Sequence, residues 1–290
     1  MWVIYQGNVF DKLQEIDIES VQCVVTSPPY WGLRNYQMDD QIGLEDTPEA
    51  FIDNMVKVFS EIKRVLKNDG TVWLNLGDSY NSQKPKNLVG IPWRVALALQ
   101  ADGWYLRQDI IWHKPNPMPE SVQDRCTKSH EYIFLLSKSA NYFYDADAIR
   151  EPIVSGPSDI KKMNEKLDRY NAKHLNGSYP LHSANKNTNI GRKRAVGSIE
   201  GRNKRSVWTI TTKPYKEAHF AVFPPKLPEL CIKAGSSEGD MVLDPFFGSG
   251  TTGWVAQRLG RKWIGIELNP EYIKIAEKRF NQQELFIECQ

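Results

Sequence analysis

The chain has 290 residues, of which 41% are hydrophobic and 25% charged, and its net charge at pH 7 is +2. These values are typical of an ordinary globular protein. The sequence contains no run of about 18 apolar residues, so we expect no membrane span. The start of the chain lacks the basic segment of a signal peptide, and we expect a cytoplasmic protein.

The cysteines and histidines do not form a metal-ligand pattern. The four cysteines are far apart and contain no CxxC pair, and the five histidines show no ligand spacing. The cysteines are Cys23, Cys126, Cys231 and Cys289. We therefore expect free thiols in a reducing compartment, with neither a metal site nor a disulfide framework.

The sequence alternates between strand and helix patterns. Residues 51–66, for example, have apolar side chains at helical spacing, and Asn68-Asp69-Gly70 follow as a stop signal. We expect strands at residues 1–7, 21–25, 71–76, 104–112, 132–136, 241–243 and 262–266. We expect helices at residues 51–66, 91–100, 227–233, 252–259 and 271–280. The alternation predicts an α/β fold with a mostly parallel sheet and helices on both faces.

Residues 151–206 interrupt this alternation. Periodicity disappears there, and the segment carries twelve Lys or Arg and five Asp or Glu, against 25 and 30 in the rest of the chain. A basic segment on an acidic body favours a polyanion-binding insertion between residues 1–150 and residues 207–290. A solvated, flexible loop is the alternative interpretation.

A glycine-rich loop joins an expected strand to an expected helix near the C-terminus. Gly248, Gly250 and Gly253 fit the pattern G-x-G-x-x-G, and Glu267 ends the next strand one βαβ unit later. Glycines let the backbone approach a ligand closely, and an acid at that place accepts hydrogen bonds from ribose hydroxyls. The loop therefore predicts a nucleoside cofactor, either a nicotinamide dinucleotide or S-adenosylmethionine.

The length of the chain and the residues beside the loop favour S-adenosylmethionine. Only 42 residues follow Gly248, too few for the second mononucleotide-binding half that a dinucleotide needs. Asp244 and Phe246 add a carboxylate and an aromatic wall, which suit a cationic sulfonium better than a pyrophosphate. A methionine carboxylate would be favoured near the start of the helix at Thr252.

The first strong strand ends in Ser27-Pro28-Pro29-Tyr30-Trp31. Two consecutive prolines remove two backbone donors, so the segment presents the Ser27 hydroxyl and the Pro28 carbonyl as acceptors. Two acceptors can hold the two hydrogens of an amino group and direct its nitrogen lone pair at an electrophile. Tyr30 and Trp31 offer faces on which a base can stack. The alternative is a proline-rich strand end with aromatic packing.

Taken together, these segments resemble the amino-group DNA methyltransferases of the permuted class, in which the catalytic segment precedes the cofactor loop. The matching segments are residues 27–30 for the (Asp/Asn/Ser)-Pro-Pro-(Tyr/Phe) motif, 244–252 for the cofactor loop, 263–267 for the strand whose acid holds ribose, 219–224 for the segment over the methionine end and 112–116 near the target-base pocket. The resemblance covers residues 1–150 and 207–283. Gly7-Asn8 departs from the Gly-Asp of many relatives, which leaves a cofactor contact at Asn8 open.

The resemblance implies a Rossmann-like, circularly permuted fold and direct transfer of the sulfonium methyl to an exocyclic amine. A serine in the first motif position leans toward cytosine N4, so we expect methylation of a flipped cytosine in duplex DNA, with adenine N6 as the nearest alternative. The implied catalytic residues are Ser27, Pro28, Pro29 and Tyr30. The implied cofactor-binding residues are Asp244, Phe246, Gly248, Gly250, Thr251, Glu267 and Phe223.

The basic insert is the candidate for target recognition. The expected DNA contacts are Trp31, Arg192, Lys193, Arg194, Arg202, Lys204 and Arg205. Double-stranded DNA and a cognate restriction endonuclease are the expected partners, while the recognition sequence and the oligomeric state stay open. Rival hypotheses are an RNA or protein amide methyltransferase, a nicotinamide oxidoreductase, and a DNA-binding module without catalysis.

Overall fold

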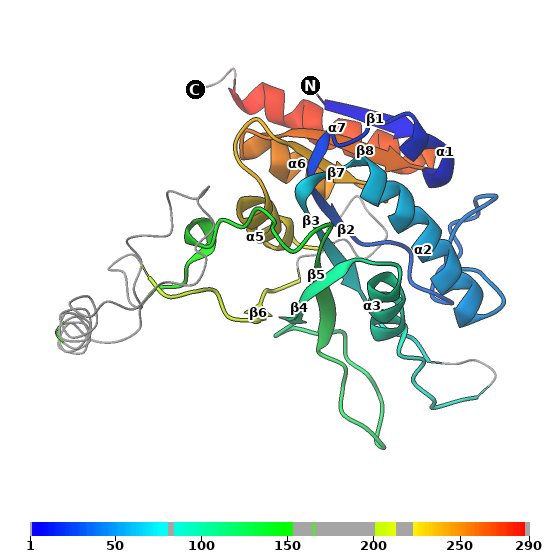
Figure 1. Cartoon of the computed structure of the whole chain (residues 1–290). Helices are drawn as coiled ribbons and strands as arrows, with labels where there is room; N and C mark the ends of the chain where they lie inside the picture. The colour runs from blue at the N-terminus through cyan, green and yellow to red at the C-terminus, as the bar shows by residue number, and fades with distance from the viewer. Residues whose placement is uncertain (1, 81–83, 153–164, 166–200, 213–222, 288–290) are drawn as a thin grey trace. The chain divides into compact units, whose positions relative to one another are not determined.

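The computed structural model describes residues 2–80, 84–152, 165, 201–212 and 223–287 (Figure 1). Contacts divide the chain into two compact units. The first unit contains residues 1–145 and 205–290, and the second contains residues 146–204. Most of the insert expected at residues 151–206 lies outside the described residues, so its boundaries stay a prediction.

Strands and helices alternate along the first unit. The strands are β1 (Trp2–Gln6), β2 (Val21–Thr26), β3 (Leu66–Leu76), β4 (Tyr105–His113), β5 (His130–Ser137), β6 (Val207–Thr209), β7 (Met241–Asp244) and β8 (Lys262–Glu267). The helices are α1 (Val9–Gln14), α2 (Pro48–Val65), α3 (Ile91–Ala101), α5 (Lys226–Gly235), α6 (Thr251–Arg258) and α7 (Pro270–Ile287). The second unit contains the short 3-10 helix η1 (Asp147–Ile149).

The strands of the described residues form one eight-stranded sheet, in the order β1-β8-β7-β2-β3-β5-β4-β6. Strand β5 runs antiparallel to both of its neighbours, β3 and β4. The other neighbouring pairs are parallel. The α/β fold with a mostly parallel sheet is therefore confirmed.

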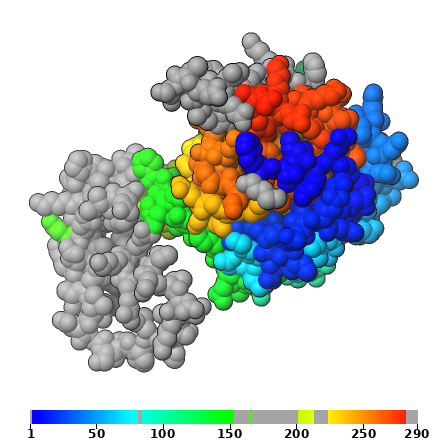
Figure 2. All heavy atoms as spheres, turned by 90° about the horizontal axis from the view of Figure 1, so that it is seen from above, coloured from blue at the N-terminus to red at the C-terminus, as the bar shows by residue number. Residues whose placement is uncertain are grey.

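The beginning and the end of the chain meet in this sheet. Strand β1 pairs with β8 from Trp2↔Trp263 to Gln6↔Glu267. Figure 2 shows the N-terminal residues, in blue, beside the orange and red C-terminal segments. The N-terminal strand thus completes the half of the sheet that the C-terminal strands build, as a circularly permuted fold requires.

Helices cover both faces of the sheet. Helices α1, α2 and α3 pack together on one face, and α5, α6 and α7 pack together on the other (Figure 1). Every residue of β2 is buried, as expected for a strand that is covered on both sides. Helix α2 begins at Pro48, where the Thr47 side chain accepts a hydrogen bond from the Ala50 N–H (3.2 Å). Its buried face consists of Phe51, Met55, Val58, Phe59, Ile62 and Val65.

The expected strands and helices are present; two short elements were not predicted, β3 starts earlier than expected, and α7 ends later, at Ile287. Helix α1 and strand β6 were not predicted because six and three residues are too short for a periodic pattern. Strand β3 starts at Leu66 and includes the expected stop signal, residues 68–70. A Cβ at Gly70 would lie 2.6 Å from the Leu66 side chain, so only glycine fits this close approach. Pairing of Leu66 with Val21 overrides the local turn signal.

The sheet reverses its strand order between β7 and β2. The chain runs from β7 to its neighbour β8 on one side, and from β2 to its neighbour β3 on the other. The carboxyl ends of these parallel strands lie at one edge of the sheet. Ligands of open α/β sheets bind in the crevice at such a point.

Candidate active site

A buried carboxylate joins the carboxyl ends of β2 and β7. Asp244, the last residue of β7, accepts hydrogen bonds from the Thr26 hydroxyl (2.7 Å) and the Thr252 hydroxyl (2.7 Å). Its Oδ1 also accepts from the Phe246 N–H (3.1 Å). Thr26 immediately precedes Ser27, and Thr252 lies in the first turn of α6. The carboxylate therefore fixes the catalytic segment against the cofactor loop.

Burial dominates the ionisation of Asp244. It raises the pKa of the carboxyl from 3.8 to about 7, although the hydrogen bonds from Thr252, Thr26 and Phe246 lower it. Among the described residues no cation forms an ion pair with Asp244. A cation brought beside this carboxyl would favour its ionised form, which suits the positively charged sulfonium expected from the sequence.

The cofactor loop, residues 245–250, is shaped by its glycines. Gly248 has φ +53° and Gly250 has φ +78°, both in the left-handed region. A Cβ at Gly248 would meet no atom within 4 Å, so space lies open beside the backbone there. The Gly248 N–H donates to Glu267 Oε2 (2.7 Å), which ties the loop to the end of β8. Burial raises the pKa of the Glu267 carboxyl, against the hydrogen bonds from backbone N–H groups.

The donor set of the loop fits S-adenosylmethionine. No described side chain caps α6, so its first N–H groups are available to a carboxylate. Ser249 Oγ is buried and has no hydrogen-bond partner in the part of the chain that the structure describes. The half-buried Glu267 has acceptor capacity left for ribose hydroxyls.

The two phenylalanines of the loop have different surroundings. Phe246, expected at the cofactor, is half-buried and packs against the hydrophobic core. Phe247 is 3% exposed and stacks on Trp263 and Phe280, with ring centroids 5.1 and 6.4 Å away. Phe247 therefore supports the loop from within the core, and a cofactor contact by Phe246 stays a prediction.

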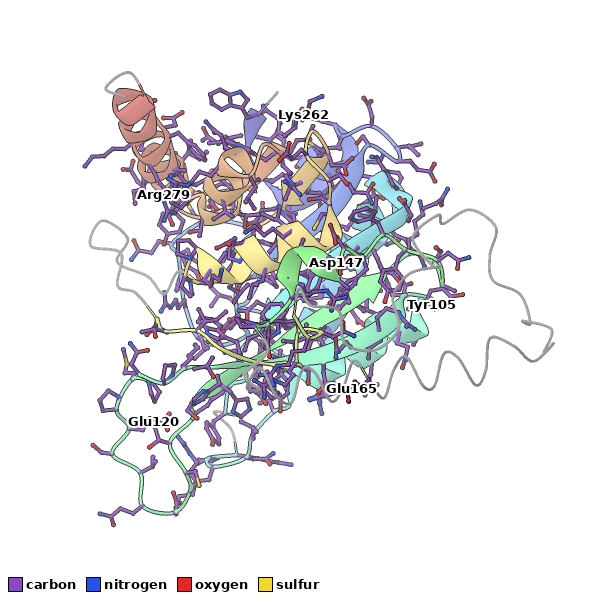
Figure 3. The ribbon with its side chains drawn as sticks, turned by 90° about the vertical axis from the view of Figure 1, so that its left-hand side faces the viewer. Tyr105, Glu120, Asp147, Glu165, Lys262 and Arg279 are labelled. Atoms are coloured by element: carbon purple, nitrogen blue, oxygen red, sulfur yellow. The ribbon has the colours of Figure 1, made fainter. Side chains whose placement is uncertain are left out.

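The two remaining residues expected at the cofactor are Thr251, the first residue of α6, and Phe223. Thr251 is buried, and its hydroxyl accepts a hydrogen bond from Nη1 of Arg279 on α7 (2.8 Å). Figure 3 labels Arg279. Arg279 Nη1 also donates to the Ser249 carbonyl (3.2 Å), so it holds the loop to α7. Phe223 is half-buried just before α5. The expected cofactor contacts of Thr251 and Phe223 stay predictions.

The catalytic segment is part of a hydrogen-bonded cluster of Ser27, Tyr30, Asn75, Glu131 and Lys114, which we call the catalytic cluster. Asn75 Nδ2 lies 2.8 Å from Tyr30 Oη, 3.0 Å from Glu131 Oε2 and 3.3 Å from Ser27 Oγ. The Tyr30 hydroxyl donates to Glu131 Oε2 (2.8 Å) and accepts from the Ser27 hydroxyl (3.4 Å). Lys114 forms an ion pair with the other Glu131 oxygen. Asn75 Oδ1 is buried and has no partner among the described residues.

The sheet order explains why these residues meet. Ser27 follows β2, and Asn75 lies near the end of the adjacent β3. Because β5 runs antiparallel to β3, its second residue Glu131 lies at the same edge, and Lys114 follows the end of β4 there. Glu131 was not predicted from the sequence because no local pattern marks it. A polar Asn75 within an apolar strand was a usable signal of a buried polar group, and Lys114 lies inside the segment expected near the base pocket.

Tyr30 is held by its ring and by its hydroxyl. A Cβ at Gly77 would lie 2.5 Å from Tyr30 Cε2, so the glycine lets the ring lie flat against the strand end. Burial raises the pKa of the Tyr30 hydroxyl well above its usual value, and the neighbouring Glu131 raises it further. Pro28 is buried and Pro29 is half-buried. The roles of residues 27–30 toward a substrate stay predictions.

Trp31 and the described cations of the insert have partners within the protein. Trp31 is 9% exposed, and its indole N–H donates to the Glu45 carbonyl (2.9 Å). Arg202 and Lys204 both pair with Glu151, at 3.1 and 3.2 Å. Residue 151 also forms a β-bridge with residue 202, so these contacts join the two ends of the insert.

The DNA contacts expected of these residues stay predictions, as does that of the exposed Arg205. Arg192, Lys193 and Arg194 lie outside the described residues. In the described part of the chain no group of three His, Cys, Asp or Glu residues could hold a metal ion. No described helix is both long and apolar enough to cross a membrane.

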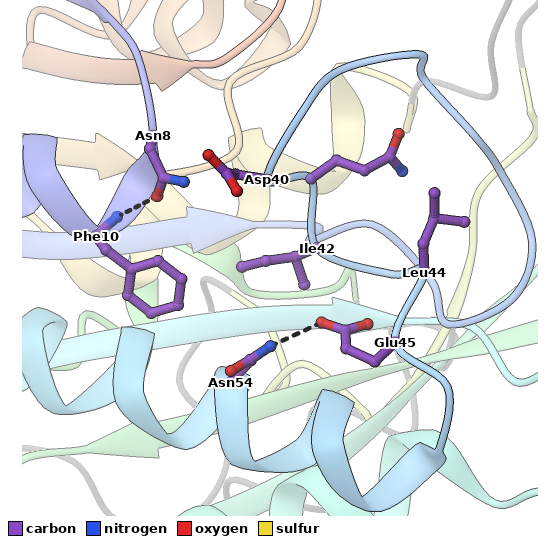
Figure 4. A pocket seen from close by; sticks show the side chains of 8 residues that line it. Asn8, Phe10, Asp40, Ile42, Leu44, Glu45 and Asn54 are labelled. Carbon is purple, nitrogen blue, oxygen red and sulfur yellow. Dashed lines mark hydrogen bonds between the residues drawn. The ribbon is translucent and has the colours of Figure 1, made fainter.

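A pocket opens next to the end of β1, at Asn8. It is lined by Asn8, Phe10, Asp40, Gln41, Ile42, Leu44, Glu45 and Asn54 (Figure 4). The Asn8 side chain caps α1 by accepting a hydrogen bond from the Phe10 N–H (3.0 Å). The neighbouring Gly7 N–H donates to the Glu267 carbonyl (2.9 Å), so the pocket adjoins the strand that carries the expected ribose acid.

The fold and this site define a methyltransferase of the α/β class. Residues 21–278 match the family model described as DNA methylase. Type II methyltransferase M.SmaI from Serratia marcescens is 46% identical, over 95% of this chain and 89% of the relative. Type II methyltransferase M.Cfr9I from Citrobacter freundii is 43% identical, over 97% of this chain and 88% of the relative.

Solved structures share this fold. The PvuII DNA methyltransferase (cytosine-N4-specific) superposes with a TM-score of 0.68 at 22% identity, covering 96% of this chain and 85% of that chain. A DNA modification methylase from Thermus thermophilus, complexed with S-adenosyl-L-methionine, has a TM-score of 0.63 at 25% identity, covering 97% and 95%.

The chain belongs to the N6/N4 DNA methylase family. Its methyl donor is S-adenosylmethionine, as the glycine loop predicts, and its substrate is DNA. These findings exclude the nicotinamide oxidoreductase considered from the sequence.

Proposed function

We propose that this protein methylates the exocyclic N4 of cytosine in duplex DNA. The observation that carries the proposal is the position of Ser27. Its hydroxyl lies at the end of β2, one residue after Thr26, whose hydroxyl bonds the buried Asp244 of the cofactor loop (2.7 Å). An acceptor for an amino group is therefore fixed next to the site of the methyl donor. The PvuII enzyme, named cytosine-N4-specific, supports the same choice of base.

The residues of the chain would act by holding the amine and exposing its lone pair. The amine of cytosine is a poor nucleophile because its lone pair is delocalised into the ring. Hydrogen bonds from the amine to Ser27 Oγ and to the Pro28 carbonyl favour a tetrahedral nitrogen, which frees the lone pair. Positioning and electrostatics then carry most of the rate. When bound, S-adenosylmethionine supplies the methyl group as an electrophile.

The loop residues would hold this methyl donor. Glu267 would accept the ribose hydroxyls, the N-terminus of α6 would bind the carboxylate, and Asp244 would lie beside the positive charge. The pocket at Asn8, which adjoins Glu267, would receive the adenine. In this arrangement Asn8 replaces the aspartate of many relatives and keeps a side-chain amide for the base.

The remaining expectations concern the target and the partner. A cytosine amine is inaccessible inside a duplex, so the base would be flipped out of the helix toward Tyr30. The basic insert would contact the surrounding DNA. The relatives named type II methyltransferases support a cognate restriction endonuclease as partner and a cytoplasmic site of action.

The test is the identity of the methylated nucleoside. Purified protein is incubated with methyl-labelled S-adenosylmethionine and mixed-sequence duplex DNA, and the digested nucleosides are identified by mass. We expect N4-methylcytosine. N6-methyladenine would overturn the choice of base, and cofactor binding without any labelled DNA would indicate a binding module or an RNA substrate.

The Ser27→Ala variant tests the role of the hydroxyl. We expect its single-turnover transfer rate to fall about 10²-fold or more, as for the loss of one positioned polar group in other active sites. Cofactor affinity, measured by calorimetry, should stay within about twofold because no described contact of Ser27 reaches the cofactor loop. An unchanged transfer rate would contradict the role assigned to Ser27.

A further inference from the structure

The catalytic cluster contains a carboxylate that the proposed transfer of the methyl group does not use. Glu131 has a side chain that is 15% exposed, and both of its oxygens have partners. One oxygen pairs with Lys114, and the other accepts from the Tyr30 hydroxyl (2.8 Å) and from Asn75 Nδ2 (3.0 Å). Lys114 also lies over the Trp112 ring, 4.3 Å from its centroid, which limits the movement of the ion pair.

The partners in the cluster fix the direction of its hydrogen bonds. Asn75 Nδ2 can only donate, so the Tyr30 oxygen accepts there (2.8 Å) and gives its own proton to Glu131. Burial and the neighbouring Glu131 raise the pKa of the Tyr30 hydroxyl, so it stays protonated. The proton of the Ser27 hydroxyl then points to the Tyr30 oxygen (3.4 Å). That distance is long, as catalytic hydrogen bonds often are without substrate.

These hydrogen-bond directions leave Ser27 Oγ free to accept a hydrogen bond from the substrate. Its proton is directed at Tyr30, and one lone pair faces Asn75 Nδ2 (3.3 Å). The other lone pair is available to the amine. Ser27, Tyr30 and Glu131 therefore form a chain of two hydroxyls that ends in a carboxylate.

We propose that Glu131 is a positioning residue for methyl transfer and that it receives, through Tyr30 and Ser27, the proton that the target amine loses. The inference rests on the proposed function, since it needs an exocyclic amine at Ser27. It assigns to Glu131 a role in orienting the Ser27 hydroxyl as an acceptor and in removing the product proton.

The step balances without any further reactant. The nitrogen lone pair forms the new N–C bond, and the electrons of the broken C–S bond stay on sulfur. The nitrogen, now cationic, loses a proton to Ser27 Oγ, while the Ser27 proton passes to Tyr30 and the Tyr30 proton passes to Glu131. The carboxylic acid formed then loses its proton to solvent. A cationic amine of this kind is a strong acid, so it can give its proton to a carboxylate.

The test compares Glu131→Gln, Tyr30→Phe and the double variant in single-turnover transfer to duplex DNA. Tyr30→Phe keeps the ring over Gly77 and removes only the hydroxyl. We expect each single variant to lower the transfer rate about 10²-fold, the usual scale for a lost proton-transfer group. Because both residues act in one relay, we expect the double variant to be at most about threefold slower than either single variant. Dissociation constants for cofactor and DNA should change by less than about twofold.

Glu229→Gln is the matched control, since Glu229 on α5 is also a partly buried carboxylate in an ion pair, with Lys233 at 2.8 Å. It should transfer methyl groups at the wild-type rate.

Rate losses of the two single variants that multiply in the double variant would show independent roles and overturn the relay. Weaker cofactor or DNA binding in Glu131→Gln with an unchanged transfer step would also overturn it. If Glu131→Gln fails to fold, an unaffected transfer rate in Tyr30→Phe is enough to overturn it. A wild-type protein that methylates no DNA would instead refute the proposed function itself.

Discussion

In both the cofactor half and the catalytic half of the site, an aromatic ring packs against a glycine, but the consequences differ. In the cofactor half, a Cβ at Gly265 of β8 would lie 2.4 Å from the Phe247 ring. In the catalytic half, a Cβ at Gly77, just after β3, would lie 2.5 Å from the Tyr30 ring. Phe247 is 3% exposed and stacks on other aromatic rings, whereas Tyr30 is half-buried and its hydroxyl belongs to the catalytic cluster.

The Phe247 ring serves packing, whereas the Tyr30 ring serves the chemistry of the site. The Phe247 N–H donates to the Ile266 carbonyl (2.9 Å), and the ring packs against Gly250, Gly253 and Gly265, so its role is to hold the loop in place. The position of the Tyr30 ring determines where its hydroxyl meets Glu131. We therefore expect the same Gly→Ala change to lower stability in one half and the transfer rate in the other.

The largest effect is expected for Gly265→Ala. The new methyl group would overlap the buried Phe247 ring, which cannot move away because Trp263 and Phe280 stack on it. We expect the free energy of unfolding to fall by about 3 kcal/mol, the upper end of the usual range for overpacking. Denaturant unfolding followed by tryptophan fluorescence measures it. A fully stable variant that has lost only its transfer rate would contradict the packing role of this half.

Gly77→Ala should act mainly on the reaction. The new Cβ would displace the Tyr30 ring at the rim of the site, where half-burial gives the ring room to move. A displacement of about 1 Å in a catalytic group can lower a rate about 10²-fold, and we expect a loss of that order. Single-turnover transfer, together with unfolding of the same sample, checks the result. A large loss of stability with a normal transfer rate per folded molecule would remove the distinction between the two halves.

Local motifs explain which parts of the site the sequence predicted. Ser27 and Glu267 were predicted because each belongs to a short segment at the end of one strand. Glu131 meets Tyr30 only because β5 runs antiparallel beside β3, and no pattern around residue 131 encodes that pairing. The Trp31 ring, expected to offer a face to a base, belongs to the hydrophobic core cluster, and this burial depends on residues distant in sequence.

The same limit applies to the fold. Regular elements of eight or more residues were predicted because their periodicity is visible in the chain itself. The short β6 was not, because its three residues become a strand only by pairing with β4. The roles of Arg202 and Lys204 at the ends of the insert depend on Glu151, about 50 residues earlier in the chain, and cation counts alone could not indicate that partner.

The smallest expected effect is on the pH dependence of stability, and it arises because the carboxylates of the two halves have different partners. Glu131 is paired with a lysine, whereas Asp244 accepts only from hydroxyls and an N–H among the described residues. Burial raises the pKa of Asp244 from 3.8 to about 7, so between these values the folded protein binds more protons than the unfolded chain. The stability that Asp244 contributes is thus fully present below about pH 4 and is lost as the pH rises through about 7.

We therefore expect the cofactor-free wild type to lose stability between pH 5 and pH 7.5 relative to Asp244→Asn, which has no carboxyl to ionise there. Glu267 has a pKa raised in the same direction by burial, and it is present in both proteins, so it cancels in the comparison. Denaturant unfolding at the two pH values measures the difference. Parallel pH dependence in the two proteins would mean that Asp244 is ionised without penalty. The pH sensitivity would then have to come from Glu267, at the other end of the cofactor loop.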